Sequence, residues 1–339
     1  MSFGAGVAVG FAMGKKMFES GGSKPEEDWT PPADWPDIPE PSDYEMYFLI
    51  DVSTVPQTFS FSISDSTGYV FNKGDLTIDW GDGIISSFFD GEDRNLYHNY
   101  NATGKYVIKV SATETSCFLQ NIVSSILLMC KLGDEIIIAG GGSIHHAFQN
   151  KYRLQYVKLG GKGGLPSQAF MNDHALCKVD ITIPPQIIPM SCFYRDYNMK
   201  KFDFSEVTAV EAGGVQMSGF EQIDMPKCET IDQRGFSSML RLKKVNLPLC
   251  TSVGNYGLSQ NYALEEVNLP LCTAVGNYGL SQNYVLEEVN LPLCTTVGEY
   301  GLYADWNLRS LTIAEGCTFG SNCFKECYNL IPHPDGSTN

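Results

Sequence analysis

The residue types that perform acid–base and nucleophilic chemistry are sparse in this sequence. Its 339 residues include five histidines, and His145 and His146 are adjacent. No carboxylate or cysteine stands at a spacing that predicts a base or a nucleophile beside this pair. A glycan hydrolase would need two facing carboxylates about 5 to 10 Å apart, a relation that one sequence does not reveal. We therefore predict a non-catalytic protein.

Three further kinds of segment resemble functional motifs but lack the sequence context that those motifs require. The segment 164–170, GLPSQAF, lacks the G-x-S-x-G frame of a nucleophile elbow. The glycine-rich segments 139–143 and 159–164 follow predicted strands with no helix after them, which excludes a phosphate-binding loop. Asp79 and Asp82 of DWGDG could hold calcium weakly, but an Asp-Gly pair is more typical of a turn. We expect no metal and no cofactor.

The cysteines indicate packing rather than redox chemistry. There are eleven, and several recur at one interval. Neighbouring strands lie about 4.8 Å apart, so disulfides along such a column are not excluded by distance. Parallel Cβ vectors suit the bond poorly, however, and we predict buried, reduced thiols. The column consists of Cys228, Cys250, Cys272 and Cys294.

The interval behind this column is an internal repeat of about 22 residues. Three successive units are nearly identical, and the first of them reads LKKVNLPLCTSVGNYGLSQNYA. Self-similarity at this period is typical of a solenoid, in which stacked units bury a face that one unit cannot bury alone. The leading apolar residues are Leu132, Leu154, Leu176, Met199, Phe220, Leu242, Leu264, Leu286, Leu308 and Leu330.

Each unit has a simple physical order. The L-x-x-V-x-L-P segment predicts a short strand with its leucines and valine inside, ended by a proline that cannot donate to a ladder. The V-G-x-Y-G-L segment predicts a tight turn in which glycines allow the backbone to bend. A phenylalanine or leucine then returns to the core, at Phe148, Phe170, Phe193, Phe236, Leu258, Leu280, Leu302 and Phe324.

This pattern resembles the BspA-type leucine-rich repeat, whose units begin L-x-x-I-x-x-P and end A-F-x-x-C-x-x-L. The last unit matches best, with CFKECYNL, whereas the units over 176–220 depart most, with AGGVQMSGF. The resemblance implies a leucine-rich-repeat solenoid over 113–331, followed by a short tail at 332–339.

Two columns on the outside of this solenoid are the candidate ligand-binding residues. One is aromatic and stands two residues before the leading position, and the other is polar and lies on the outer face of the strands. Aromatic stripes suit a sugar or a protein partner, and near-identical units favour a repetitive ligand. The alternatives are a structural edge and a solvated sheet face. The candidates are Tyr152, Tyr197, Tyr262, Tyr284, Trp306, Tyr328, Asn246, Asn268, Asn290, Glu266 and Glu288, with His174 in the aromatic column.

The segment 44–112 predicts a small β-domain before the repeats. YFLIDV, FSFSIS and GKYVIKVSA carry β-branched and aromatic residues in partial alternation. The combination of IDWGDG, YHNY and GKYVIKV resembles the PKD domain, an immunoglobulin-like β-sandwich, and implies structural roles for Trp80, His98 and Tyr100. The segment is short for seven strands, which indicates a missing or merged strand. The fold class is therefore mainly β, a small PKD-like sandwich followed by the solenoid.

Two segments precede this domain. Residues 1–19 are apolar and glycine-rich, too short to span a bilayer as a simple helix, and Lys15 and Lys16 follow the apolar run, unlike the order in a signal peptide. We predict an attachment segment that contacts a membrane surface or a partner protein, with no stable membrane span. Residues 20–43 are rich in proline and acidic residues, which predicts an extended linker.

Charge and module composition narrow the function. The formal net charge of -16 disfavours nucleic acid as a partner. PKD-like and BspA-like modules together resemble adhesion proteins of gut bacteria, whereas free cysteines and the absence of a convincing signal peptide indicate synthesis in the cytoplasm. We predict a phage or prophage tail-associated receptor-binding protein of the virion. It would bind a host cell-surface protein or glycan, and other virion or envelope proteins through its N-terminus. The alternatives are a bacterial cell-surface adhesin and a purely structural virion or envelope protein.

Overall fold

The computed structural model describes residues 29–64, 75–89, 96–113, 117–138, 148–161 and 164–337. The predicted attachment segment, 1–19, lies outside these ranges, as do His145 and His146. The chain divides into one unit at Met1–Trp35 and another at Pro36–Asn339, and the second contains all of the strands.

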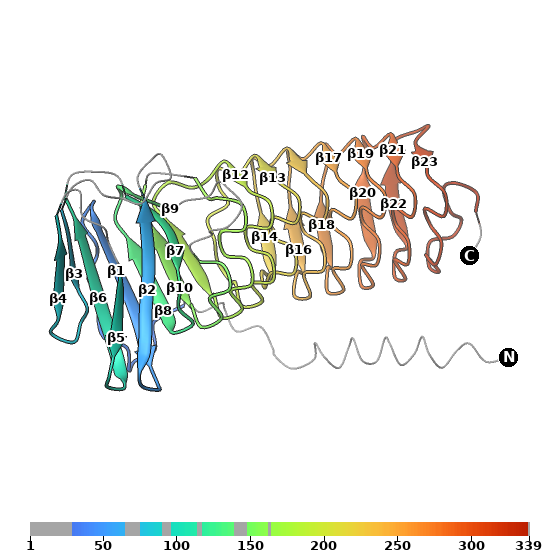
Figure 1. Cartoon of the computed structure of the whole chain (residues 1–339). Helices are drawn as coiled ribbons and strands as arrows, with labels where there is room; N and C mark the ends of the chain where they lie inside the picture. Colours follow the sequence, from blue (N-terminus) through green and yellow to red (C-terminus); the bar gives the residue numbers. More distant parts are fainter. Residues whose placement is uncertain are drawn as a thin grey trace. The chain divides into compact units, whose positions relative to one another are not determined.

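A β-sandwich forms the first part of the second unit (Figure 1). One sheet has the order β11-β10-β8-β1-β6-β3-β4 and the other the order β5-β2-β7-β9. Phe48 of the first sheet packs against Phe59 and Phe61 of the second, with ring centroids 5.6 and 5.2 Å apart, so the core lies between the sheets. The strands are β1 (Glu45–Val52), β2 (Gln57–Ser64), β3 (Leu76–Asp79), β4 (Ile85–Phe88), β5 (Tyr97–Tyr100), β6 (Gly104–Ala112), β7 (Cys117–Ile122), β8 (Leu127–Leu132), β9 (Ile136–Ile138), β10 (Tyr156–Leu159) and β11 (Lys178–Ile181).

Strands beyond residue 112 complete both sheets of this sandwich. β7 pairs with β2 and β9, while β8 pairs with β1. These strands supply what the segment 44–112 lacks on its own. The module boundary at residues 112 and 113 stays a prediction. Strand pairs β7–β2 and β8–β1 join residues on its two sides.

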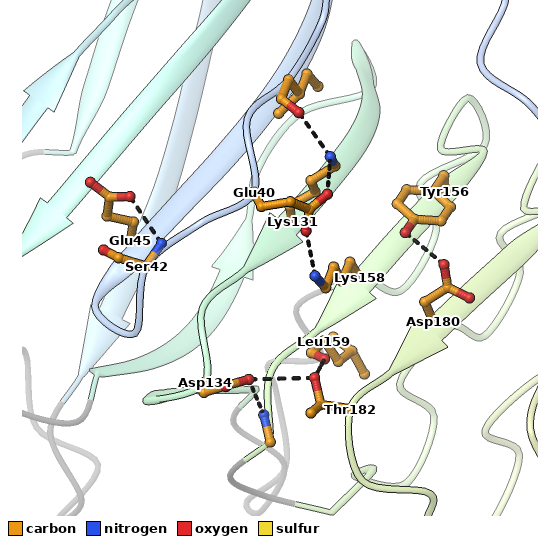
Figure 2. Close-up of polar contacts among 12 residues, drawn as sticks. Glu40, Ser42, Glu45, Lys131, Asp134, Tyr156, Lys158, Leu159, Asp180 and Thr182 are labelled. Atoms are coloured by element: carbon orange, nitrogen blue, oxygen red, sulfur yellow. Dashed lines mark hydrogen bonds and ion pairs between the residues drawn. The ribbon is translucent and has the colours of Figure 1, made fainter.

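The seam between sandwich and repeats is a continuous sheet. β8 pairs antiparallel with β1 on one side and parallel with β10 on the other. The Glu40 carboxylate accepts hydrogen bonds from Lys131 and Lys158, which stand on β8 and β10, and Lys131 also donates to the Ile38 carbonyl over 2.8 Å (Figure 2). The end of the predicted linker is thereby bound to the first strands of the repeat stack.

The repeats form a β-solenoid, as the period predicts. Each leading apolar residue and each returning phenylalanine or leucine is buried. The strands that follow the leading residues are β14 (Gln222–Asp224), β16 (Lys244–Asn246), β18 (Glu266–Asn268), β20 (Glu288–Leu291) and β22 (Ser310–Ile313), which we call the first series. All strand pairs within the repeats are parallel.

A second parallel sheet, which the sequence reasoning missed, runs along the stack. It is continuous over seven two-residue strands in the order β12-β13-β15-β17-β19-β21-β23, which we call the second series. Its valines, such as Val253 and Val275, are buried. The strands are β12 (Ile187–Ile188), β13 (Ala209–Val210), β15 (Thr230–Ile231), β17 (Ser252–Val253), β19 (Ala274–Val275), β21 (Thr296–Val297) and β23 (Thr318–Phe319).

The glycines of V-G-x-Y-G-L have a different role from the predicted one. The left-handed residue of this turn is the tyrosine, with φ of 58° at Tyr256 and 56° at Tyr278, and not the glycine beside it. A Cβ on Gly254 would lie 2.8 Å from the carbonyl carbon of Asp232, and one on Gly257 would lie 2.7 Å from a Val253 methyl. These glycines are required by close packing between and within units, so the prediction that they supply the bend is wrong.

Candidate functional site

The aromatic column of the near-identical units stands where each turn enters the first series of strands. Tyr262, Tyr284 and Trp306, which we call the corner column, form one parallel stack. Ring centroids are 4.8 Å apart from Tyr262 to Tyr284 and 4.0 Å apart from Tyr284 to Trp306, with interplanar angles of 3° and 7°. The buried leucine two residues after each ring fixes its position. Burial, followed by the neighbouring Tyr262, raises the pKa of Tyr284 to about 12, so its hydroxyl remains a hydrogen-bond donor.

The stack decides which atoms of the corner column can reach a ligand. In a parallel stack at this spacing, each inner ring has a neighbouring ring on both faces, and Tyr284 is such a ring. A sugar therefore has no free ring face to lie against at Tyr284. All three side chains are half-buried, and what the stack leaves for a ligand is a row of ring edges with hydroxyl groups on Tyr262 and Tyr284, repeated at the spacing of the strands.

The rest of the aromatic column forms a separate group. Tyr152 and Tyr197 flank His174 with ring centroids 5.2 and 5.1 Å away and tilted planes. The positions between Tyr197 and Tyr262 hold Ser218 and Leu240, which interrupt the column. Of the predicted aromatic residues, the structure thus brings together two sets of three.

Tyr328 stands at the end of the column. Its side chain is exposed, and no ring stack involving it is present in the described part of the chain.

The predicted polar residues lie on the outer face of the first series. Lys244 and Glu266 form an ion pair with 2.9 Å between Nζ and Oε2. The Asn268 side-chain amide donates to Asn246 over 2.6 Å, and Asn246 donates to Asp224 over 2.8 Å. Part of this face is therefore satisfied by its own neighbours, as a solvated sheet face would be.

The remaining predicted residues, Glu288 and Asn290, line an open hollow of about 420 Å³ next to this face. The hollow is lined by Glu265, Glu266, Val267, Val285, Glu287, Glu288 and Asn290.

A second tyrosine column was missed by the sequence reasoning. Tyr256, Tyr278 and Tyr300, which we call the turn column, stack with centroids 4.8 Å apart at both steps and interplanar angles of 3° and 8°. The Arg234 guanidinium covers one end of the stack, 4.9 Å from the centre of Tyr256. The signal in the sequence is the tyrosine that recurs in V-G-x-Y-G-L, a segment whose pattern predicts only a turn.

Uncharged amides stand in the same turns, between the two tyrosine columns in sequence. Gln260 accepts a hydrogen bond from Ser238 over 2.9 Å, and its amide donates to Gln282 over 3.0 Å. In the next unit Tyr303 packs edge-on against Tyr300, with centroids 5.4 Å apart, and donates to Glu326 over 3.1 Å. The first two of these turns present aromatic and amide groups, whereas the third has Ala304 at the glutamine position and presents a second tyrosine.

The cysteine column is buried, as predicted. All four thiols are free, and the Cys272 sulfur donates to the Ala274 carbonyl over 3.3 Å, a contact that the other three repeat. Burial raises the pKa of Cys250 and of Cys272 to about 12, so neither thiol is a nucleophile at neutral pH.

The residues of the sandwich motif contact one another rather than an open site. His98 stacks on Trp80 with centroids 5.1 Å apart and bonds the Asp82 carboxylate over 2.7 Å, and the Tyr100 hydroxyl donates to the Trp80 carbonyl over 2.8 Å. Asp79 accepts from the Gly81 amide over 2.9 Å, and Asp82 of the Asp-Gly pair accepts from the Ile84 amide over 3.2 Å, as aspartates do in turns. These contacts are structural.

In the described ranges, no three His, Cys, Asp or Glu side chains come together in a way that could hold a metal ion. The same ranges contain no helix with the length and hydrophobicity of a membrane span.

Comparison with known proteins identifies the repeat. Residues 120–225 and 210–331 match the BspA type leucine rich repeat region. No curated protein matches the chain. A leucine-rich repeat protein from Bacteroides ovatus is similar at 14% identity and a TM-score of 0.28, over 66% of this chain and 77% of its own. A leucine rich cell surface protein from Faecalibacterium prausnitzii is similar at 12% identity and a TM-score of 0.37, over 67% of this chain and 95% of its own.

Proposed function

Because this chain belongs to the family of BspA-type leucine-rich repeat proteins, we propose that it is a non-catalytic adhesin of the bacterial cell surface. Repeats of this family are binding repeats, and the match spans more than half of the chain. The main prediction from the sequence, a phage or prophage tail-associated receptor-binding protein, rested on the free cysteines and on residues 1–19, which lie outside the described ranges. The family match favours the alternative given there, a bacterial cell-surface adhesin.

The ligand contacts the near-identical units through the corner column and the turn column. The observation that supports this assignment is the set of parallel stacks, in which the same ring edges and hydroxyls recur in each unit. Tyrosine supplies large contact area with little conformational entropy to lose, which favours it at recognition surfaces. A ligand that repeats along its length would meet the same group several times, and its binding would be strengthened by multivalency.

A polysaccharide with hydroxyl groups along its chain fits this surface better than a charged polymer. The accessible groups are phenol hydroxyls and ring edges, and the nearby amides of Gln260 and Gln282 are neutral. The overall charge of -16 repels anionic polymers. A polar protein surface is the competing ligand, and the binding assay separates the two.

The test removes the corner column and compares it with a matched control. A variant with Tyr262, Tyr284 and Trp306 replaced by Ala should lose binding to cell-wall polysaccharides or to host cells. The control replaces Leu249, Leu271 and Leu293 by Ala, since these side chains are 43%, 39% and 48% exposed and recur at the same period elsewhere on each unit. The control should bind normally.

A second pair of substitutions separates binding from stability. Tyr262→Phe with Tyr284→Phe keeps the stack and removes the hydroxyls, so it should weaken binding while the unfolding temperature stays unchanged. If the alanine variant unfolds earlier yet still binds, the column is a structural edge and the proposed contact is wrong. Unchanged binding by both variants would favour a structural role for the whole chain.

A further inference from the structure

The first series of strands contains one interruption. β14, β16 and β18 form one sheet and β20 and β22 form another, although the second series is continuous past the same place. The amides of Glu265 and Glu266 donate to the Lys243 carbonyl over 2.8 and 3.1 Å. In the next unit, no corresponding hydrogen bond joins Glu287 or Glu288 to the Glu265 carbonyl. The stack is therefore open between β18 and β20 in the first series, and closed between β19 and β21 in the second series.

The side chains of the first series show the same interruption between β18 and β20. The asparagine ladder that joins Asp224, Asn246 and Asn268 does not continue to Asn290 within the described residues. Val267 is 9% exposed, whereas Val245 and Val289 at the same position of the flanking units are each 1% exposed. The open hollow of about 420 Å³ lies at this place.

The open junction between β18 and β20 differs from the closed junctions on either side of it in the charged residues that begin each unit. The units begin LKK, LEE, LEE and LRS, in order along the stack. At the junction before the opening, Lys244 forms an ion pair with Glu266. At the junction after it, Arg309 forms an ion pair with Glu287. At the open junction Glu265 and Glu266 face Glu287 and Glu288, and like charges directly opposite each other destabilise strand pairing.

We infer that the contact between β18 and β20 is a charge-controlled joint, which is open while the carboxylates of its four glutamates repel one another and closes when cations screen or neutralise that charge. The charged groups around it are those four carboxylates, Lys243 and Lys244 on one flank and Arg309 on the other. None of the three flanking ion pairs, Lys243–Glu221, Lys244–Glu266 and Arg309–Glu287, spans the joint. Since the second series holds the backs of both units together, the joint opens the polar face of the first series without separating the units.

Amide hydrogen exchange on the full chain tests the joint directly. In low salt, the amides of Glu287 and Glu288 should exchange about tenfold or more faster than those of Glu265 and Glu266, because only the latter pair is hydrogen-bonded across units. Between about 0.01 M and about 1 M sodium chloride, the screening length falls from about 30 Å to about 3 Å. The exchange of Glu287 and Glu288 should slow over this range. Equal exchange of the two pairs in low salt would overturn the inference.

Substitutions then separate charge from shape as the cause. Glu288→Lys places a lysine opposite Glu266, so that opposite charges face each other across the joint, and should slow exchange at Glu287 and residue 288 about tenfold in low salt. Glu299→Lys makes the same change in net charge on the exposed turn and should leave exchange at the joint unchanged. Val285→Ala reduces an apolar side chain that lines the hollow and stands three residues before β20. If Val285→Ala slows exchange and Glu288→Lys does not, bulk rather than charge holds the joint open, and the inference fails.

Discussion

At the scale of single residues, the turns hold buried aspartates where other units hold asparagine. Asp305 occupies the position of Asn283 and Asn261, and all three are fully buried. Each accepts a backbone amide, as Asp305 does from Asn283 over 2.7 Å. The asparagine at position 261 also donates its side-chain amide to the Leu258 carbonyl over 2.9 Å, whereas the second carboxylate oxygen of Asp305 has no hydrogen-bond partner. Burial raises the pKa of Asp305 well above its ordinary value.

Asp305→Asn should therefore stabilise the protein at neutral pH. A raised pKa in the folded state means that the contribution of Asp305 is fully present below its unfolded pKa, near 3.9, and is lost as pH rises toward the folded value. The asparagine variant removes this loss and supplies a donor, which we expect to raise the free energy of unfolding by about 1 to 3 kcal/mol at pH 7. Urea unfolding at several pH values measures it, and the difference should shrink toward pH 4.

The reverse substitution is the matched control. Asn283→Asp places a carboxyl in the same kind of turn and should destabilise the protein at pH 7 more than at pH 4. Two variants with the same stability as the parent across this range would contradict the inference that burial raises the pKa of Asp305.

At the scale of elements, the sequence predicts what is periodic and long, and misses what is short. Leu264 and its equivalents specified the first series, because their spacing and burial follow from one pattern. The second series could not be predicted from the sequence, because a strand of two residues such as Ser252–Val253 is too short to show alternation. The residues of the corner column could be predicted from their recurrence in the sequence. Their parallel stacking could not, because it depends on packing between units. The open joint likewise depends on Glu288 facing Glu266, a relation that no single unit contains.

Leu264→Ala tests the element that the period predicts. The side chain is fully buried in the core of the stack, so its truncation leaves a cavity and should lower the free energy of unfolding by about 2 to 5 kcal/mol. Leu271→Ala, in the same unit, removes a side chain that is 39% exposed and should change stability by no more than about 0.5 kcal/mol. Denaturant unfolding compares them. Equal losses would mean that Leu264 does not face the core.

At the scale of the whole molecule, the sandwich and the solenoid share a sheet. β8 is hydrogen-bonded to β1 on one side and to β10 on the other, so the sandwich covers the first edge of the repeat stack. Solenoids need such a cover, because an uncovered end exposes both strand edges and core. Two separate modules at 44–112 and 113–331, as the sequence patterns suggest, would not depend on each other in this way.

A fragment of residues 113–337 should consequently fail to fold as a soluble monomer. Removing β1 to β6 leaves β7 and β8 without their antiparallel partners and exposes side chains that are buried in the whole chain, such as Leu119 and Cys130. Size-exclusion chromatography and thermal unfolding would show aggregation or loss of a cooperative transition. A chain that lacks only residues 1–35 retains the whole second unit and should behave like the parent. A monomeric, cooperatively folded 113–337 fragment would show that the modules are independent.

The near-identity of the central units has a consequence for how such a chain can grow. When a unit is copied next to itself, each outward side chain is placed against its own duplicate. Tyr284 tolerates this on Tyr262 by stacking, and Asn268 tolerates it on Asn246 by donating a hydrogen bond. A glutamate on a glutamate has no such solution, as Glu266 and Glu288 show. Lengthening by duplication thus favours side chains that are compatible with themselves, and charge must be changed after each copy for the new junction to close.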